Sequence, residues 1–224
     1  ECARAILERY AEGRDYHVRI ATSSQIPVSR GLKSSSAAAN AIIAAMLDAL
    51  DVEYDELEAV QLGARAAVRA GVSVTGAFDD ACAAWFGGVV LTDNTSDTIL
   101  SRDTMPDDVV VFIHVPERQI RKSALPGERI AAVRDIVDVA FDLAEKGDYY
   151  RALTLNGMCY SAALGLDTDI AVRALQNGAL AAGLTGSGPA TVMLVERSEA
   201  GDFEREMDGC TLMRASINNG RSIE

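Results

Sequence analysis

Residues 24–50, SQIPVSRGLKSSSAAANAIIAAMLDAL, contain the feature on which the rest of the chain depends. The first half holds Pro27, Gly31 and three consecutive serines, which is typical of a loop. The second half, residues 37–50, has neither glycine nor proline and is almost wholly apolar, which predicts a helix. Its apolar residues do not keep to one stripe, so we expect a helix that is buried on most sides.

The junction between this loop and this helix has the parts of a phosphate site. A serine there is a good N-cap, and the first turn of a helix presents backbone N–H groups and the positive end of the helix dipole. Arg30 and Lys33 add positive charge. The stretch is not a P-loop, because no glycine stands five residues before Gly31. An ordinary capped core helix is the competing interpretation.

Composition limits the class of protein. The 224 residues include 33 acidic and 21 basic ones, for a formal net charge of −12, which argues against nucleic acid as a partner. The four cysteines have no metal-binding or disulfide spacing, which is typical of reduced thiols in a cytosolic protein. The sequence shows neither a signal peptide nor an apolar run of transmembrane length, so we expect a cytoplasmic protein without a membrane partner.

Helical and strand patterns follow one another without regular βαβ order, which predicts an α+β fold. Residues 16–20 alternate in the manner of a strand. Residues 94–108 are polar and include a proline, so they are the best candidate for a domain boundary. We therefore predict an N-terminal domain over residues 1–105 and a C-terminal domain over residues 106–224.

Two helices have recognisable start signals. Asp55 with Glu58 predicts a capping box at the start of a helix over residues 55–70. Asp148 is the expected cap of a second helix over residues 149–164.

Two further stretches carry polar residues that could perform chemistry. Asp79 and Asp80 stand in a glycine-bounded, otherwise apolar stretch that we interpret as a turn before a strand at residues 85–91. We expect one of the two carboxylates to face a substrate; turn and cap roles for both are the competing interpretation. The sequence TGSGPA at residues 185–190 indicates a glycine-rich turn before a strand.

These three motifs, in this order, resemble those of the GHMP small-molecule kinases. The central motif stands here as Pro27, a spacer and GLKSSSAA at residues 31–38, and its variant SRGLKSSSAAANA looks most like the archaeal type of shikimate kinase. The resemblance implies the two-domain GHMP kinase fold, with nucleotide bound between the domains. It implies ATP-dependent phosphorylation of a shikimate hydroxyl to shikimate 3-phosphate, a step of chorismate and aromatic amino-acid biosynthesis. Phosphorylation of homoserine or mevalonate, or a non-catalytic nucleotide-binding role, are the alternatives.

The resemblance also implies roles for single residues, with ATP and Mg²⁺ as cofactors. Asp79, with Asp80 as second choice, corresponds to the aspartate that faces the acceptor hydroxyl. Ser35 corresponds to the serine that holds the metal, whereas the stretch that matches the family's second metal ligand reads ARAA at residues 64–67 and has no carboxylate. The implied nucleotide-binding residues are Pro27, Gly31, Leu32, Lys33, Ser34, Ser35, Ser36, Ala37, Gly186, Ser187 and Gly188.

A cation is needed to hold the carboxylate of shikimate in an otherwise acidic protein. The densest basic cluster, Arg118, Arg121 and Lys122, is our candidate, because arginine grips a carboxylate through two parallel hydrogen bonds. A solvated surface loop is the competing interpretation. The family's first motif, which helps to bind the acceptor, has no match before residue 24, so we expect a preceding segment to be absent from this chain.

Overall fold

The computed structural model describes residues 1–11, 13–71, 76–117 and 126–220, which form two compact units. The first unit comprises the described residues of Glu1–Ile26 and Lys33–Thr104, together with residues 219–220. The second comprises Pro27–Leu32 and the described residues of Met105–Asn218. The part of the central motif that precedes Lys33 therefore folds with the C-terminal part of the chain.

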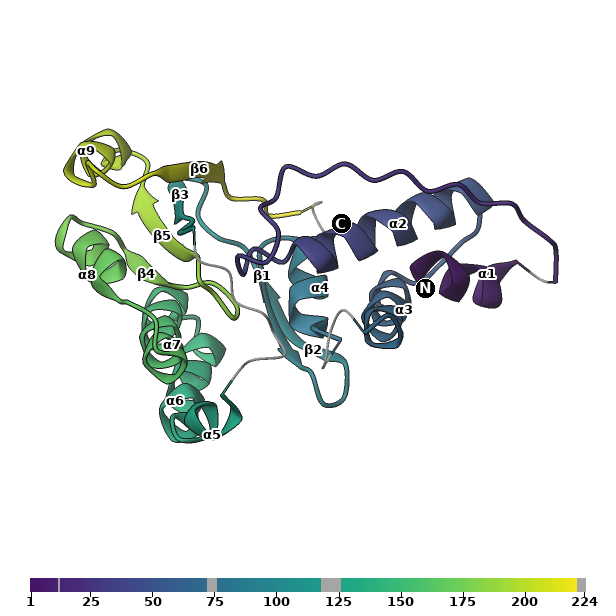
Figure 1. Ribbon diagram of the computed structural model, residues 1–224, viewed down its shortest axis with the longest axis horizontal. Coiled ribbons are helices and arrows are strands. Elements are labelled where there is room, and N and C mark those ends of the chain that lie inside the picture. Colours follow the sequence, from purple (N-terminus) through teal and green to yellow (C-terminus); the bar gives the residue numbers. More distant parts are fainter. Residues whose placement is uncertain (12, 72–75, 118–125, 221–224) are drawn as a thin grey trace. The chain divides into compact units, whose positions relative to one another are not determined.

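In its described residues, the first unit contains four helices and a two-stranded hairpin (Figure 1). Helices α1, α2 and α3 share a core that includes the fully buried Ile6, Ile43 and Leu47. Helices α3 and α4 share a second core around Phe78 and Cys82, against which the antiparallel hairpin packs. The elements are α1 (Cys2–Tyr10), α2 (Ser34–Leu50), α3 (Glu56–Arg69), α4 (Phe78–Phe86), β1 (Val89–Asp93) and β2 (Thr98–Asp103).

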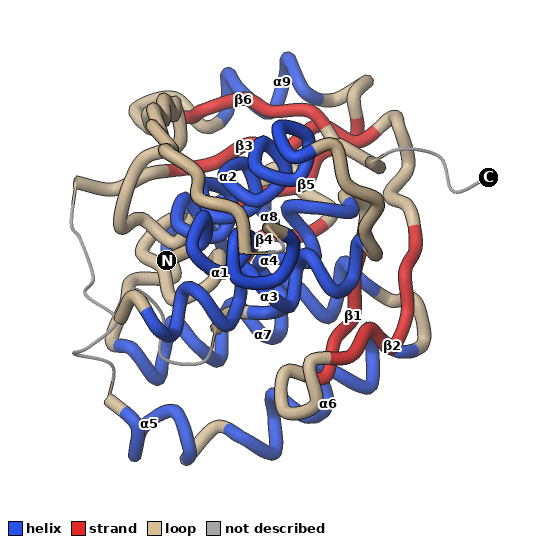
Figure 2. Tube along the Cα trace, turned by 90° about the vertical axis from the view of Figure 1, so that its right-hand side faces the viewer, coloured by secondary structure: helices blue, strands red, loops and turns tan. Residues whose placement is uncertain are grey.

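The second unit is built on a four-stranded antiparallel sheet with the order β4-β5-β3-β6, whose strands are red in Figure 2. The register sets Phe112 opposite Met193, and both side chains are fully buried. The ring of Phe203 packs on that of Phe112, with 5.2 Å between the ring centroids. The elements are β3 (Val109–His114), α5 (Gly127–Ala131), α6 (Arg134–Glu145), α7 (Tyr149–Leu164), α8 (Asp169–Gln176), β4 (Ala181–Leu184), β5 (Thr191–Glu196), α9 (Ala200–Glu206) and β6 (Leu212–Ser216).

Both predicted helix starts are confirmed. The Asp55 carboxylate accepts a hydrogen bond from the backbone N–H of Glu58 at 2.7 Å, and α3 begins directly after Asp55. The Asp148 carboxylate accepts from the N–H of Arg151 at 3.4 Å at the start of α7. Each of these carboxylates satisfies a backbone donor that the helix itself leaves without a partner.

The burial predicted for α2 is wrong. Its buried residues, Ser36, Ala39, Asn40, Ile43, Met46 and Leu47, follow one helical stripe. Ala41, Ala44 and Ala45 are exposed. Alanine fits either environment, because its single methyl group contributes little apolar surface, so an alanine-rich sequence does not reveal which side of a helix is buried.

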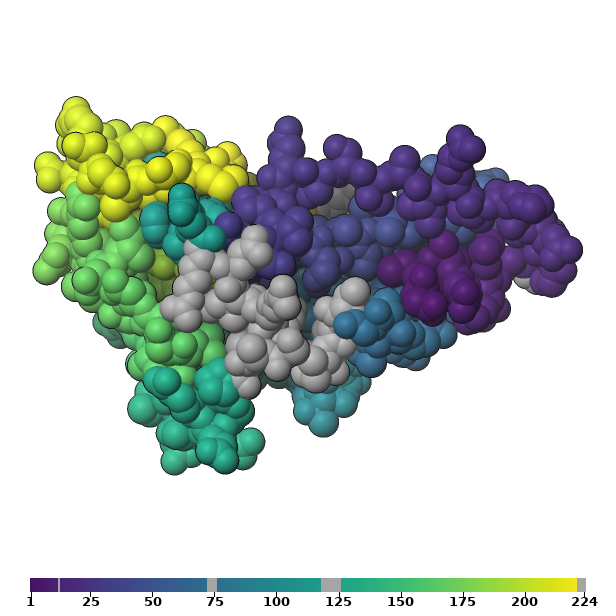
Figure 3. Space-filling view, in the orientation of Figure 1, coloured from purple at the N-terminus to yellow at the C-terminus, as the bar shows by residue number. Residues whose placement is uncertain are grey.

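The strand predicted over residues 16–20 is also wrong. These residues form no strand, and the side chains of Tyr16, Val18 and Ile20 are 41%, 43% and 48% exposed. Figure 3 shows the dark purple N-terminal part of the chain at the surface. Alternation produces a strand only where another strand takes up the hydrogen bonds, and among the described residues no strand pairs with this segment.

The turn predicted around Asp79 and Asp80, and the strand predicted over residues 85–91, are replaced by helix. Both aspartates lie in the first turn of α4, which continues to Phe86. Strand β1 starts only at Val89, after two glycines with positive φ. A short apolar run fits helix and strand equally well, so periodicity alone cannot distinguish them.

Helix α7 approaches β4 at a contact between two glycines. A Cβ atom on Gly157 would stand 2.5 Å from both the Gly183 Cα and the Leu184 backbone nitrogen. We therefore expect Gly157→Ala to lower the free energy of unfolding by about 2 kcal/mol, as overpacking does. Urea unfolding measures this, with Gly201→Ala in α9 as control, because a Cβ there meets no atom within 4 Å. Equal unfolding midpoints for the two variants would contradict the contact.

Candidate active site

Helix α2 begins on a residue with left-handed backbone geometry. The N-cap is Lys33, with φ 59° and ψ 25°, and its side chain makes no capping hydrogen bond. The predicted serine N-cap is therefore wrong: Ser34, Ser35 and Ser36 lie inside the first turn. Of the three serines, Ser35 is exposed and Ser36 is buried. A helix start without a side-chain cap keeps backbone N–H groups available to an anion.

Helix α4 begins in the same manner. Its N-cap, Ala77, has φ 49° and makes no side-chain hydrogen bond to the helix. Before it, Gly76 has φ 81°, and a Cβ there would lie 3.2 Å from the Ala64 carbonyl oxygen of α3. Phe78 is fully buried and anchors the first turn. Asp79 and Asp80 are thereby held at the N-terminal end of α4, where the helix dipole favours negative charge.

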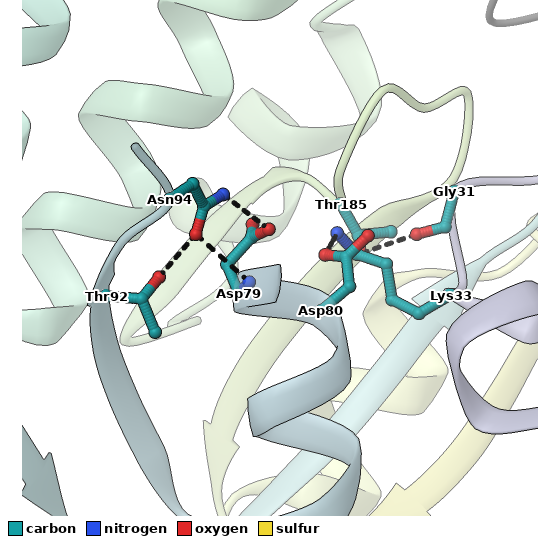
Figure 4. A network of polar contacts seen from close by, with 7 residues as sticks. All are labelled: Gly31, Lys33, Asp79, Asp80, Thr92, Asn94 and Thr185. Carbon is teal, nitrogen blue, oxygen red and sulfur yellow. Dashed lines mark hydrogen bonds and ion pairs between the residues drawn. The ribbon is translucent and has the colours of Figure 1, made fainter. Parts of the chain in front are cut away.

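Two contacts join the N-terminal parts of α2 and α4. The Lys33 Nζ atom forms an ion pair with Asp80 Oδ1, and the Asp80 side chain is only 10% exposed (Figure 4). Deeper in the unit, Asn40 Nδ2 donates to the Ala81 carbonyl oxygen at 2.9 Å. These contacts bring the uncapped, serine-containing start of α2 together with the acidic start of α4.

The two neighbouring aspartates have different surroundings. Successive residues of a helix point about 100° apart, so their side chains face different ways. Asp80 turns to Lys33, whereas Asp79 is exposed and accepts a hydrogen bond on Oδ1 from Asn94 Nδ2 at 2.9 Å. Within the described part of the chain, the second carboxylate oxygen of this exposed residue has no hydrogen-bond partner.

In the second unit, residues 27–32 contact the glycine-rich loop at residues 185–190. The Thr185 hydroxyl donates to the Gly31 carbonyl oxygen at 3.1 Å. The Ala190 backbone N–H donates to the Arg30 carbonyl oxygen, also at 3.1 Å. Gly31 has φ 82°, and a Cβ there would meet the Thr185 carbonyl oxygen and lie 2.9 Å from the Gly188 nitrogen. Both the backbone angle and the close approach require glycine.

The predicted site residues are therefore distributed over both units. The second unit holds Pro27, Gly31, Leu32, Gly186, Ser187 and Gly188. The first holds Lys33, Ser34, Ser35, Ser36, Ala37, Asp79 and Asp80. Arg118, Arg121 and Lys122 lie outside the described residues, so the predicted carboxylate site stays a prediction.

Three polar residues of this region escaped the sequence reasoning. Thr92 and Asn94 lie in a polar stretch that gave no chemical signal, although Asn94 bonds Asp79. Asn40 was detectable as the one amide in an alanine-rich helix. Its Oδ1 is buried and has no hydrogen-bond partner among the described residues.

The described residues also limit other chemistries. They contain no group of three or more His, Cys, Asp or Glu residues arranged to hold a metal ion. Burial raises the pKa of the Cys82 thiol to about 12, which keeps this thiol protonated and unreactive at neutral pH. In the same part of the chain, no helix is both long enough and apolar enough to cross a membrane.

Two family models match the chain. The model of the GHMP kinases N terminal domain matches residues 1–88, and that of the GHMP kinases C terminal matches residues 139–210. The chain belongs to the GHMP kinase family. The α+β class and the two-domain GHMP kinase fold predicted from the sequence are thereby confirmed.

Archaeal GHMP kinases are similar to this chain over most of its length. The shikimate kinase of Methanothrix thermoacetophila is 44% identical, over 97% of this chain and 75% of its own length. That of Methanococcoides burtonii is 48% identical, over 87% of this chain and 67% of its own. Among solved structures, the Methanococcus jannaschii mevalonate kinase has a TM-score of 0.71 at 18% identity, over 97% of this chain and 74% of that one.

The Lys33–Asp80 ion pair should contribute to stability because it is partly withdrawn from water. We expect Asp80→Asn to lower the free energy of unfolding by about 1–2 kcal/mol, since it leaves a shielded ammonium without its counter-charge. The matched control is Asp202→Asn, which breaks the exposed Arg205–Asp202 pair of α9 and should cost less than about 0.5 kcal/mol. Urea unfolding at neutral pH compares the two, and an equally small effect of both would contradict a structural role for Asp80.

Proposed function

We propose that this GHMP kinase transfers the γ-phosphoryl group of ATP to a hydroxyl of shikimate, giving shikimate 3-phosphate. One observation carries the proposal: in the first unit, the uncapped start of α2 lies against the acidic first turn of α4, joined by the Lys33–Asp80 ion pair. The choice of shikimate as acceptor rests on the archaeal relatives at 44% and 48% identity that bear the name shikimate kinase.

The first turn of α2 suits a triphosphate. It combines backbone N–H groups, the positive end of the dipole of a 17-residue helix, and the Lys33 ammonium. ATP would supply the phosphoryl group there, and Mg²⁺ would neutralise its oxygens. Ser35 is exposed in this turn and its hydroxyl could ligate the metal. The Gly31–Thr185 contact would hold the glycine-rich loop in a fixed conformation for the nucleotide.

Asp79 is the better of the two candidates for the group that receives the hydroxyl proton. Its free carboxylate oxygen can hydrogen-bond the acceptor hydroxyl and take its proton as the hydroxyl oxygen bonds to phosphorus. Asp80 is engaged by Lys33 and would instead keep that ammonium in place. Arg118 and Arg121, with Lys122, remain the proposed partners of the shikimate carboxylate.

The function is tested by measuring ADP release with shikimate, homoserine and mevalonate, using the full-length natural protein. We expect turnover with shikimate, and we expect Asp79→Asn to lower kcat by roughly 10²–10⁴-fold, the usual contribution of a general base. The melting temperature of this variant should change little, because Asp79 is exposed and an exposed charge at a helix N-terminus contributes only about 0.3–1 kcal/mol. Asp79→Asn also controls for a contaminating kinase, whose activity would not respond to the substitution. Turnover with homoserine or mevalonate alone would overturn the choice of acceptor.

A second measurement tests the metal role of Ser35. Ser35→Ala removes the hydroxyl but leaves the backbone N–H groups of α2 in place. We expect Mg²⁺-dependent turnover to fall by about tenfold or more, while the Kd of nucleotide measured without metal changes less than about twofold. If binding and turnover fall together, or neither falls, Ser35 is not a metal ligand.

A further inference from the structure

The β1–β2 hairpin carries an irregularity directly beside the first turn of α4. The pairing of β1 with β2 shifts its register between Leu91 and Thr92. Such bulges re-aim the side chains that follow them. Here the Thr92 hydroxyl, directly after the irregularity, points to the Asn94 amide, which in turn bonds Asp79 (Figure 4).

Asn94 makes three hydrogen bonds that fix its orientation. Its Oδ1 accepts from the Thr92 hydroxyl at 2.8 Å and from the Asp79 backbone N–H at 3.2 Å. Its Nδ2 donates to Asp79 Oδ1 at 2.9 Å. A flipped amide would turn its NH₂ group toward the Asp79 N–H, which cannot accept a hydrogen bond. The network therefore admits one orientation of the amide.

Asn94 thus holds both ends of the same residue. One bond satisfies the backbone N–H of Asp79, which α4 leaves without an intrahelical partner. The other grips one carboxylate oxygen and so fixes the rotation of the carboxylate, leaving the second oxygen available. Thr92 in turn holds the amide in place through its hydroxyl.

We propose that Asn94, supported by Thr92, is the positioning residue that aims the free carboxylate oxygen of Asp79 at the acceptor hydroxyl. This inference rests on the proposed function, because Asn94 would act on the reaction only through Asp79, the proposed proton acceptor. A proton acceptor that is free to rotate spends less time in the productive geometry. Loss of the Nδ2 donor should therefore lower the rate of phosphoryl transfer while leaving nucleotide binding intact.

A merely structural cap of α4 makes a different prediction. Asn94→Asp is nearly isosteric and keeps an oxygen that accepts from the Asp79 N–H and from the Thr92 hydroxyl. It loses the donor to the Asp79 carboxylate and sets a second negative charge beside that carboxylate, which repels it. A purely structural role would thus survive in Asn94→Asp, whereas a positioning role would not.

The experiment compares kcat, KM for ATP and melting temperature in Asn94→Asp, Asn94→Ala, Thr92→Val and Thr92→Ser. We expect kcat to fall by about tenfold or more in both Asn94 variants, with KM for ATP within about twofold of wild type. Thr92→Val should lower kcat less, and Thr92→Ser should restore it because the hydroxyl returns. Ser96→Ala is the control: it removes a hydrogen bond to Asp93 in the same hairpin without touching Asn94, and should keep wild-type kcat.

The outcomes separate this inference from the proposed function. A kcat of Asn94→Asp within twofold of wild type, while Asp79→Asn is inactive, overturns the positioning role and leaves the proposed function standing. Unimpaired turnover in Asp79→Asn overturns the catalytic assignment of Asp79, and the role of Asn94 with it. A fall in kcat that is matched by equal losses in Ser96→Ala, or explained by a lower melting temperature, also overturns the positioning role.

Discussion

The candidate site depends on the left-handed backbone at the starts of α2 and α4. Lys33 and Ala77 both adopt positive φ, a geometry that costs a residue with a side chain about 1–2 kcal/mol. In return, neither N-cap residue closes its helix start with its own side chain. Backbone N–H groups at the start of α2 therefore stay available to an anion, and the Asp79 N–H at the start of α4 is left for the Asn94 side chain. At Lys33, where the common GHMP pattern has glycine, the side chain offsets part of this cost through its ion pair with Asp80.

The helical geometry of α4 also separates the tasks of its two acidic residues. In an extended turn, Asp79 and Asp80 would have pointed to opposite sides, and either could have faced a substrate. In the helix, burial of Phe78 fixes the rotation of the first turn. In this rotation the Asp80 carboxylate contacts the Lys33 ammonium, and the Asp79 carboxylate contacts the Asn94 amide. One carboxylate is thus neutralised and the other is kept partly open.

Local signals were sufficient for much of the chain. The side chains of Asp55 and Asp148 marked the starts of α3 and α7, because a cap acts on N–H groups only two or three residues away. The order of the serine, aspartate and glycine motifs was enough to indicate the family. Local signals failed where the secondary structure or the burial of a segment depended on partners that are distant in the sequence. Residues 16–20 alternate but meet no strand among the described residues, and the alanines of α2 did not reveal its buried stripe.

The sequence by itself determined which chemical groups are present: a lysine and three serines at residues 33–36, an acidic pair at residues 79–80, and glycines at residues 31, 186 and 188. Only the tertiary structure decided which of these groups meet. Lys33 and Asp80 are 47 residues apart in the chain, and Asp79 and Asn94 are 15 apart. Contacts over such separations leave no periodic or capping signal, because they form only when α2, α4 and the β1–β2 hairpin pack around their buried apolar side chains.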